Sequence, residues 1–248
     1  MRIGIIGGSA LSRIDSLQSV HREMVNTPYG APSCPLTFGA MAGNEVVFLP
    51  RHGSKHNLAP HEVNYRANIF ALRQLGVSHV IGVAAVGGIS SNMAPLSLVF
   101  PDQIIDYTFG RHHTFHDSQE MRVRHVDFTY PYDETMRQQM IAAAEALGLT
   151  YAATGTYGAT QGPRLETAAE IRRLQRDGCD IVGMTGMPEA VLARELDLKY
   201  ACCALVVNWA AGIQPGKTVS INEIEANLRT GMDTLLQLLA QVLPVMTE

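Results

Sequence analysis

The chain has 248 residues, of which 46% are hydrophobic and 17% charged, and its formal net charge is −4. This length can bury a core of its own, so we expect one domain over residues 1–248. The longest apolar runs stop well short of the roughly 20 residues that span a membrane, and no run of Lys or Arg offers a surface for nucleic acid. The expected partner is therefore a small molecule.

Short apolar runs rich in β-forming residues alternate with helical patterns along the whole chain. The runs that predict strands cover residues 3–6, 46–49, 80–86, 97–100, 154–160, 180–184 and 200–207. Several lack polar alternation, which is typical of strands buried on both faces. The pattern predicts an α/β fold, with helices flanking a largely buried sheet.

Helical spacing of apolar residues lies between these runs. It predicts helices over residues 61–75, 133–147 and 166–176, and a last one after Ser220. The first three patterns each stop beside a glycine, the usual residue after a helix end. Ser220 and Glu223 have the spacing of a capping box before the widest apolar stripe. The long polar segment 106–132 is expected to be a functional or subunit-contacting loop.

Small residues close the first predicted strand, in the order Gly4-Ile5-Ile6-Gly7-Gly8-Ser9. Backbone N–H groups of such a turn, with the Ser9 hydroxyl, are able to bind a phosphate. The glycines do not follow the spacing of a dinucleotide site or of a P-loop. A tight turn that merely needs glycine explains them as well.

Other strand ends carry residues suited to an anion or a nucleoside. Arg51 and His52 follow one strand, and small residues with Thr185 follow another. An arginine fork binds anions, and ligands of open α/β sheets bind where several strands end. Glu166 at a helix start and Asn208 at a strand end could read polar edges of a ligand. Each of these residues also has an interpretation without a ligand. Arg51 would then be an ordinary surface arginine, Glu166 only a charge at a helix start, and Asn208 a cap of a helix or turn.

Histidines at 112, 113 and 116, with Asp117, leave a zinc site open as an alternative, although HExxH spacing is absent. Neither a Gly-x-Ser-x-Gly elbow nor a cysteine with a nearby histidine supports a hydrolase. The four cysteines have no CxxC spacing, and Met1 leads directly into a strand-like run. Reduced thiols and the lack of a secretory leader predict a cytoplasmic protein.

In this order, the motifs resemble those of the trimeric purine nucleoside phosphorylases and S-methyl-5′-thioadenosine phosphorylases. The residues that carry the resemblance are 4–9, Arg51-His52-Gly53, Pro60 with 63–68, 85–88, Gly162-Pro163-Arg164 and 183–189. The resemblance implies a single-domain mixed β-sheet flanked by helices, assembled as a homotrimer with active sites near subunit contacts. It also implies phosphorolysis of a nucleoside with inorganic phosphate as co-substrate and no metal or organic cofactor.

The resemblance also implies a role for each candidate residue. The phosphate is expected to contact Ser9, Arg51, His52, Ala84, Ala85 and Thr185. The nucleoside is expected to contact Val86, Gly87, Leu165, Glu166, Met184, Asn208, Ala210, Ile221 and Ile224, together with His125 reaching over from the neighbouring subunit. Asn208, Glu166 and His52 are expected to act in catalysis.

Two positions separate subgroups of this family. Members that cleave adenine nucleosides carry Ser and Asp where this chain has Glu166 and Asn208, whereas members acting on 6-oxopurines carry Glu and Asn. A carboxylate accepts a hydrogen bond from the N1–H of hypoxanthine, and an amide donates to O6 or N7, which an ionised Asp cannot do. The residues therefore favour a 6-oxopurine base.

The sugar end is predicted to meet an apolar wall. Where members that bind a 5′-hydroxyl place a histidine, this chain has Val219, Ile221 and Ile224. A methylthio group fits such a wall, each buried methyl-sized group contributing roughly 0.8 kcal/mol. The expected substrate is S-methyl-5′-thioinosine, giving hypoxanthine and 5-methylthioribose 1-phosphate, with S-methyl-5′-thioadenosine, inosine or guanosine as alternatives. A nucleoside sensor, a dinucleotide-dependent oxidoreductase and a hydrolase using water also remain open.

Overall fold

The computed structural model describes residues 2–8, 18–117 and 122–246. Its strands are β1 (Arg2–Gly7), β2 (Gln18–Glu23), β3 (Leu36–Met41), β4 (Asn44–Pro50), β5 (His79–Gly88), β6 (Leu98–Val99), β7 (Gln103–Asp106), β8 (Tyr151–Ala152), β9 (Thr156–Ala159), β10 (Ile181–Gly183) and β11 (Lys199–Trp209). Its helices are α1 (Tyr65–Gln74), α2 (Glu134–Ala146), α3 (Ala168–Arg176), α4 (Gly186–Glu195) and α5 (Ile221–Val242), followed by a 3₁₀ turn (Leu243–Val245).

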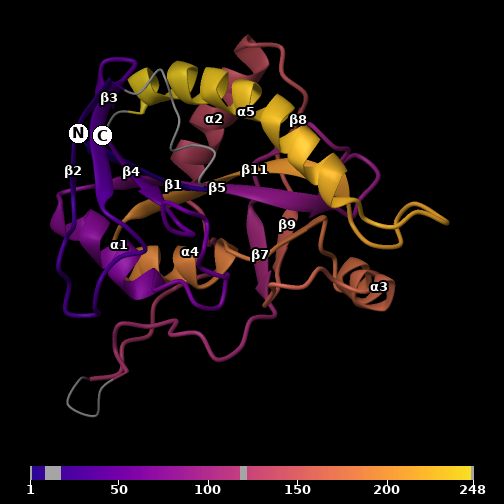
Figure 1. The fold of residues 1–248 in the computed structure, drawn as a ribbon, viewed down its shortest axis with the longest axis horizontal. Helices are drawn as coiled ribbons and strands as arrows, with labels where there is room; N and C mark the ends of the chain where they lie inside the picture. Colours follow the sequence, from indigo (N-terminus) through magenta and orange to yellow (C-terminus); the bar gives the residue numbers. More distant parts are fainter. Residues whose placement is uncertain (1, 9–17, 118–121, 247–248) are drawn as a thin grey trace.

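All these strands belong to one mixed sheet in the middle of the fold (Figure 1). The main path runs β2-β3-β4-β1-β5-β10-β9-β7, and β11 pairs with both β5 and β6. Strands β4, β1, β5 and β11 are parallel to one another, so their carboxyl ends meet at the same edge of the sheet. This edge is where an open α/β sheet binds its ligands. The predicted α/β fold is confirmed.

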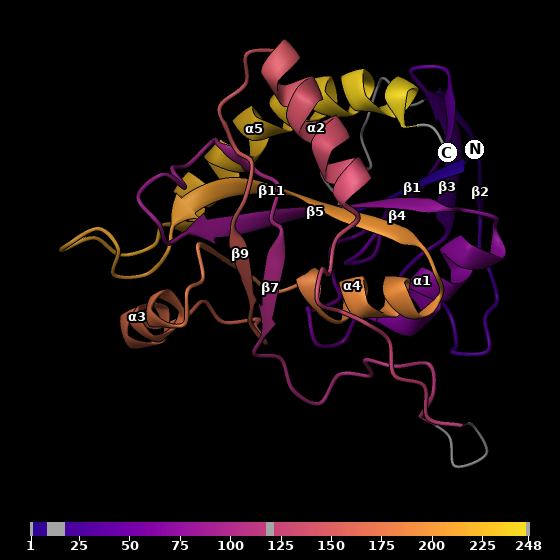
Figure 2. The same cartoon turned by 180° about the vertical axis from the view of Figure 1, so that it is seen from behind.

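Helices cover both faces of the sheet (Figures 1 and 2). On one face α1 and α4 pack on a core that includes Ile69, Leu72 and Ala190. On the other face α2 and α5 bury a second core, with Met140 and Leu235 at its centre. A smaller cluster joins α3 to the ends of β5 and β10. Burial on both faces accounts for the continuous apolar runs of the central strands.

Side-chain caps set where the helices begin. Asn64 accepts a hydrogen bond from the backbone N–H of Ala67, so α1 begins at Tyr65 and not at residue 61 as predicted. Thr167 forms a complete capping box at the start of α3, which leaves Glu166 in the preceding loop. Ser220 caps α5 by accepting a hydrogen bond from the N–H of Glu223. Within the described ranges, no helix is long and apolar enough to cross a membrane.

Candidate active site

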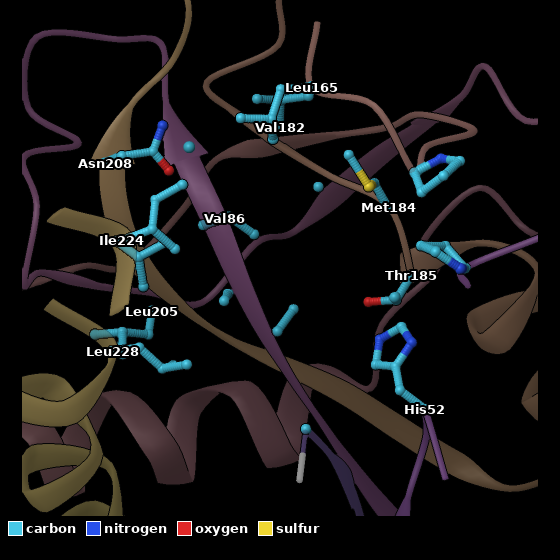
Figure 3. A pocket seen from close by; sticks show the side chains of 18 of the residues that line it. His52, Val86, Leu165, Val182, Met184, Thr185, Leu205, Asn208, Ile224 and Leu228 are labelled. Carbon is cyan, nitrogen blue, oxygen red and sulfur yellow. The ribbon is translucent and has the colours of Figure 1, made fainter. Parts of the chain in front are cut away.

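A cavity of about 620 Å³ opens where β5, β10 and β11 end. The turn after β4, the loop before α3, and the first half of α5 complete its walls. In Figure 3, Asn208, Ile224 and Leu228 face Met184, Thr185 and His52 across the cavity. Ala85 is exposed although β5 lies inside the sheet, because this part of the strand forms the cavity floor.

Most of the residues predicted for the site line this single cavity. They are Arg51, His52, Ala84, Ala85, Val86, Gly87, Leu165, Glu166, Met184, Thr185, Asn208, Ala210 and Ile224. Ser9 lies outside the described residues. Ile221 does not line the cavity, contrary to the prediction: it is the first residue of α5, one turn before Ile224, and is 58% exposed. His125 is exposed and does not line the cavity of its own chain, and its role in a neighbouring subunit stays a prediction.

Arg51 is buried, and most of its guanidinium is already bonded. Its Nε and Nη2 donate to the two carboxylate oxygens of Glu189, at 2.6 and 2.7 Å. Nη1 donates to the carbonyl of Val83, and Nη2 also donates to the carbonyl of Ile6. Of the five N–H groups of a guanidinium, these contacts leave one, on Nη1, for a ligand. The guanidinium of Arg51, predicted to bind a ligand anion, therefore binds Glu189. In these contacts among the described residues, one N–H of Arg51 remains for an anion.

Glu189, the partner of Arg51, lies in the 183–189 motif, but no role is predicted for it from the sequence. It is fully buried and also accepts a hydrogen bond of 2.8 Å from the Tyr200 hydroxyl. Burial alone lowers the pKa of Arg51, but the charge and hydrogen bonds of Glu189 outweigh it, and the pKa of Arg51 lies above its ordinary value. The Arg51 guanidinium is therefore held in its charged form against the Glu189 carboxylate, which is its counter-charge.

The His52 ring is held in one tautomer. Its Nδ1 lies 2.9 Å from the carbonyl oxygen of Leu58, and because a carbonyl only accepts, Nδ1 carries the proton. Burial, followed by the positive charge of Arg51, lowers the pKa of His52 to about 4. The ring is therefore neutral near pH 7, and its Nε2 is a hydrogen-bond acceptor beside Thr185.

This shift predicts a pH dependence of stability. The unfolded chain, with a histidine pKa of about 6.5, binds more protons than the folded chain between about pH 6.5 and 4. The stability that neutral His52 contributes is complete above pH 6.5 and is lost as the pH falls towards 4. We expect the free energy of unfolding, measured in urea from pH 7.5 to 4.5, to fall less steeply in His52→Gln than in the wild type. Parallel curves would contradict this.

Glu166 and Asn208 are each fixed by one hydrogen bond. Thr160 donates its hydroxyl to Oε1 of Glu166 at 2.6 Å, and Asn208 donates from Nδ2 to the carbonyl of Trp209 at 2.8 Å. Asn208 follows a shift in the β5–β11 register and pairs with Gly87. The second carboxylate oxygen of Glu166 and the second amide N–H of Asn208 remain to bind a ligand in the cavity.

The described histidines of the 106–132 loop lie near partners other than the metal ion considered as an alternative. Nδ1 of His112 lies 3.5 Å from Asp117, and Arg66 binds the same carboxylate oxygen at 2.6 Å. Within the part of the chain that the structure describes, no three His, Cys, Asp or Glu side chains are grouped to hold a metal ion. The described loop instead packs on α4, where Glu195 accepts hydrogen bonds from Thr114 and Phe115.

A mixed sheet with helices on both faces and a ligand-sized cavity at the carboxyl edge defines an α/β protein that binds a small molecule. The model of the family described as "Phosphorylase superfamily" matches residues 2–244. The chain belongs to this superfamily, and the predicted resemblance is confirmed.

Named relatives match nearly end to end. A probable S-methyl-5′-thioinosine phosphorylase of Pseudomonas syringae is 53% identical over 239 residues, covering 96% of this chain and 97% of the relative. The 6-oxopurine nucleoside phosphorylase of Pyrococcus furiosus is 44% identical, with 100% and 94% covered. Among solved structures, methylthioadenosine phosphorylase from Schistosoma mansoni in complex with adenine superposes with a TM-score of 0.95, at 31% identity and with 99% and 92% covered.

Proposed function

We propose that this chain catalyses the phosphorolysis of S-methyl-5′-thioinosine to hypoxanthine and 5-methylthioribose 1-phosphate. The observation that carries the proposal is one cavity lined by Glu166, Asn208 and the apolar side chain of Ile224. The names of the Pseudomonas and Pyrococcus relatives support the same base class.

The base is read by the two fixed polar side chains. Glu166 accepts the N1–H of hypoxanthine, and the free amide N–H of Asn208 donates to N7 or O6 of the ring. The departing purine gains negative charge as the bond to C1′ breaks, so a donor at N7 stabilises the transition state more than the ground state. Asn208 is thereby both a recognition residue and a catalytic one.

The phosphate occupies the end of the cavity beside β5 and the turn before α4. There it meets the remaining N–H of Arg51, the backbone of Ala84 and Ala85, and the hydroxyl of Thr185; Ser9 is proposed to complete this shell. Nε2 of His52 accepts a hydrogen bond from the P–OH group of a hydrogen phosphate ion, and the proton stays on the phosphate. Held in place, the phosphate attacks C1′ as the sugar develops positive charge, so orientation and charge stabilisation supply the catalysis.

The 5′-methylthio group packs on Val219, Ile224 and Leu228, which line the cavity beside Asn208. Burying a methyl-sized group contributes roughly 0.8 kcal/mol, and a 5′-hydroxyl buried there without a partner costs about 1–3 kcal/mol. The wall thus disfavours inosine while accepting the thioether. We further propose that the protein is a cytoplasmic homotrimer, that His125 reaches a neighbouring cavity, and that phosphate is needed without any other cofactor.

The proposal is tested by incubating purified protein with S-methyl-5′-thioinosine, with and without phosphate. We expect hypoxanthine by chromatography and a sugar 1-phosphate by ³¹P NMR, both only when phosphate is present. Hypoxanthine with free methylthioribose in phosphate-free buffer would show a hydrolase. Nucleoside binding without any turnover would show a sensor. Either result contradicts the proposal.

A further inference from the structure

The basic residues predicted to hold the phosphate supply little positive charge. The charge of Arg51 is matched by Glu189, with both side chains at most 3% exposed. His52 donates its Nδ1 proton to Leu58 and presents a lone pair to the cavity. A hydrogen phosphate ion carries up to two negative charges and must lose much of its hydration to bind here. Such a transfer is unfavourable without a positive charge nearby.

Arg111 is a buried arginine with unusual partners. Its guanidinium donates to the carbonyl oxygens of Met184 and Met187 at 2.8 and 2.6 Å, and to those of Thr160 and Gln161 at 3.3 and 2.8 Å. The Gln161 side chain and the Tyr65 hydroxyl accept its other hydrogen bonds. Every partner is a neutral oxygen. These contacts therefore bring no negative charge to balance the guanidinium of Arg111.

No carboxylate contacts this guanidinium among the described residues. Glu195, a buried carboxylate that contacts the same loop, accepts hydrogen bonds from Thr114 and Phe115. The exposed carboxylate of Asp117 is bound by Arg66. By contrast Arg137, which is also buried and also donates to carbonyl oxygens, has Glu134 as an ionic partner. Arg111 thus differs from Arg51 and Arg137, which are paired with the carboxylates of Glu189 and Glu134.

Arg111 lies next to the backbone that carries Thr185, at the end of the cavity proposed to bind phosphate. Met184 and Met187, whose carbonyls it binds, lie on either side of Thr185, which is the N-cap residue of α4; Met187 is the second residue of that helix and has a non-helical backbone. Thr185 lines the cavity opposite Asn208 and beside His52 (Figure 3). Arg111 is buried and does not itself line the cavity, so water screens its charge less than it screens that of a surface arginine.

We propose that Arg111 supplies the positive charge that attracts phosphate into this site, acting through the Thr185 turn without touching the anion. The proposal rests on the phosphate-dependent function proposed above. It also gives the 106–132 loop a role within its own subunit, since that loop delivers Arg111 to the back of the site. Arg111 is therefore a positioning and electrostatic residue, whereas contact with phosphate belongs to the cavity-lining groups.

The test separates charge from structural support by comparing two substitutions at pH 7. Arg111→Met removes the charge, and Arg111→Lys keeps the charge while losing the planar fork. We expect the Met variant to raise the KM for phosphate about tenfold or more and the KM for the nucleoside less than threefold. The Lys variant should keep the phosphate KM within about threefold of the wild type. Arg111→Gln, which retains N–H donors, replaces the Met variant if that one does not fold.

Arg66→Met is the matched control, because Arg66 contacts the same loop but has Asp117 as its ionic partner. We expect its phosphate KM to equal that of the wild type. Equal increases in the neutral and Lys variants, or an unchanged phosphate KM in the neutral variant, would overturn the proposal. A wild-type protein without phosphate-dependent turnover would instead contradict the proposed function.

Discussion

The double substitution Glu166→Ser with Asn208→Asp is expected to reverse the base preference, from S-methyl-5′-thioinosine towards S-methyl-5′-thioadenosine. The substitution at 166 removes the carboxylate that accepts the N1–H of hypoxanthine, and the shorter serine has a hydroxyl that can donate to the unprotonated N1 of adenine. The aspartate accepts a hydrogen bond from the amino group of adenine. Each unpaired buried group costs about 1–3 kcal/mol, so the ratio of kcat/KM values should change between about 30-fold and 10⁴-fold. Steady-state kinetics on both nucleosides measure this ratio.

The control for this exchange is Glu170→Ser. Glu170 lies in the first turn of α3, pairs with the exposed Arg164 and does not line the cavity. We expect this variant to lose some helix stability and to keep the substrate ratio of the wild type. A double variant at 166 and 208 with an unchanged ratio would show that other groups read the base.

The substitution Glu189→Gln is expected to have the largest effect on stability. It leaves the charge of Arg51 buried without a counter-charge, in a site where both side chains are at most 3% exposed. Removing one partner of a buried pair costs about 3–5 kcal/mol, which for a chain of this size lowers the Tm by about 6–20 °C. Differential scanning calorimetry measures the change.

Glu45→Gln provides the comparison, because Glu45 pairs with Arg2 at the surface and its side chain is 70% exposed. An exposed pair contributes no more than about 1 kcal/mol, so this variant should unfold within a few degrees of the wild type. If Glu189→Gln behaves like Glu45→Gln, Glu189 does not balance the charge of Arg51 in the folded protein.

The central strands and most helices could be predicted because their sequences carry strong local signals. Buried parallel strands give continuous apolar runs, and Asp133 and Ser220 mark helix starts. Helix α4 was missed because most of its residues are buried, including Gly186 and Pro188, so no polar face reveals a helical period. Strand β2 has a largely polar sequence, and β3 contains a glycine, so neither shows the pattern of a buried strand.

The position of the cavity could also be predicted, since parallel strands end at a common edge. What the sequence could not give was the pairing of groups distant along the chain. Arg51 and Glu189 are 138 residues apart, and their contact depends on the packing of α4 against the sheet. Backbone carbonyls carry no sequence signal, so the partners of Arg111 could not be foreseen. Ile221 was misplaced because helical spacing does not show where a cavity ends.

The roles given to Glu166, Asn208 and Ile224 are tested most directly by comparing kcat/KM for S-methyl-5′-thioinosine, S-methyl-5′-thioadenosine, inosine and adenosine at saturating phosphate. We expect S-methyl-5′-thioinosine to be the best substrate, inosine to follow with a moderate loss, and both adenine nucleosides to be far poorer. A preference for S-methyl-5′-thioadenosine over S-methyl-5′-thioinosine would contradict the roles given to Glu166 and Asn208.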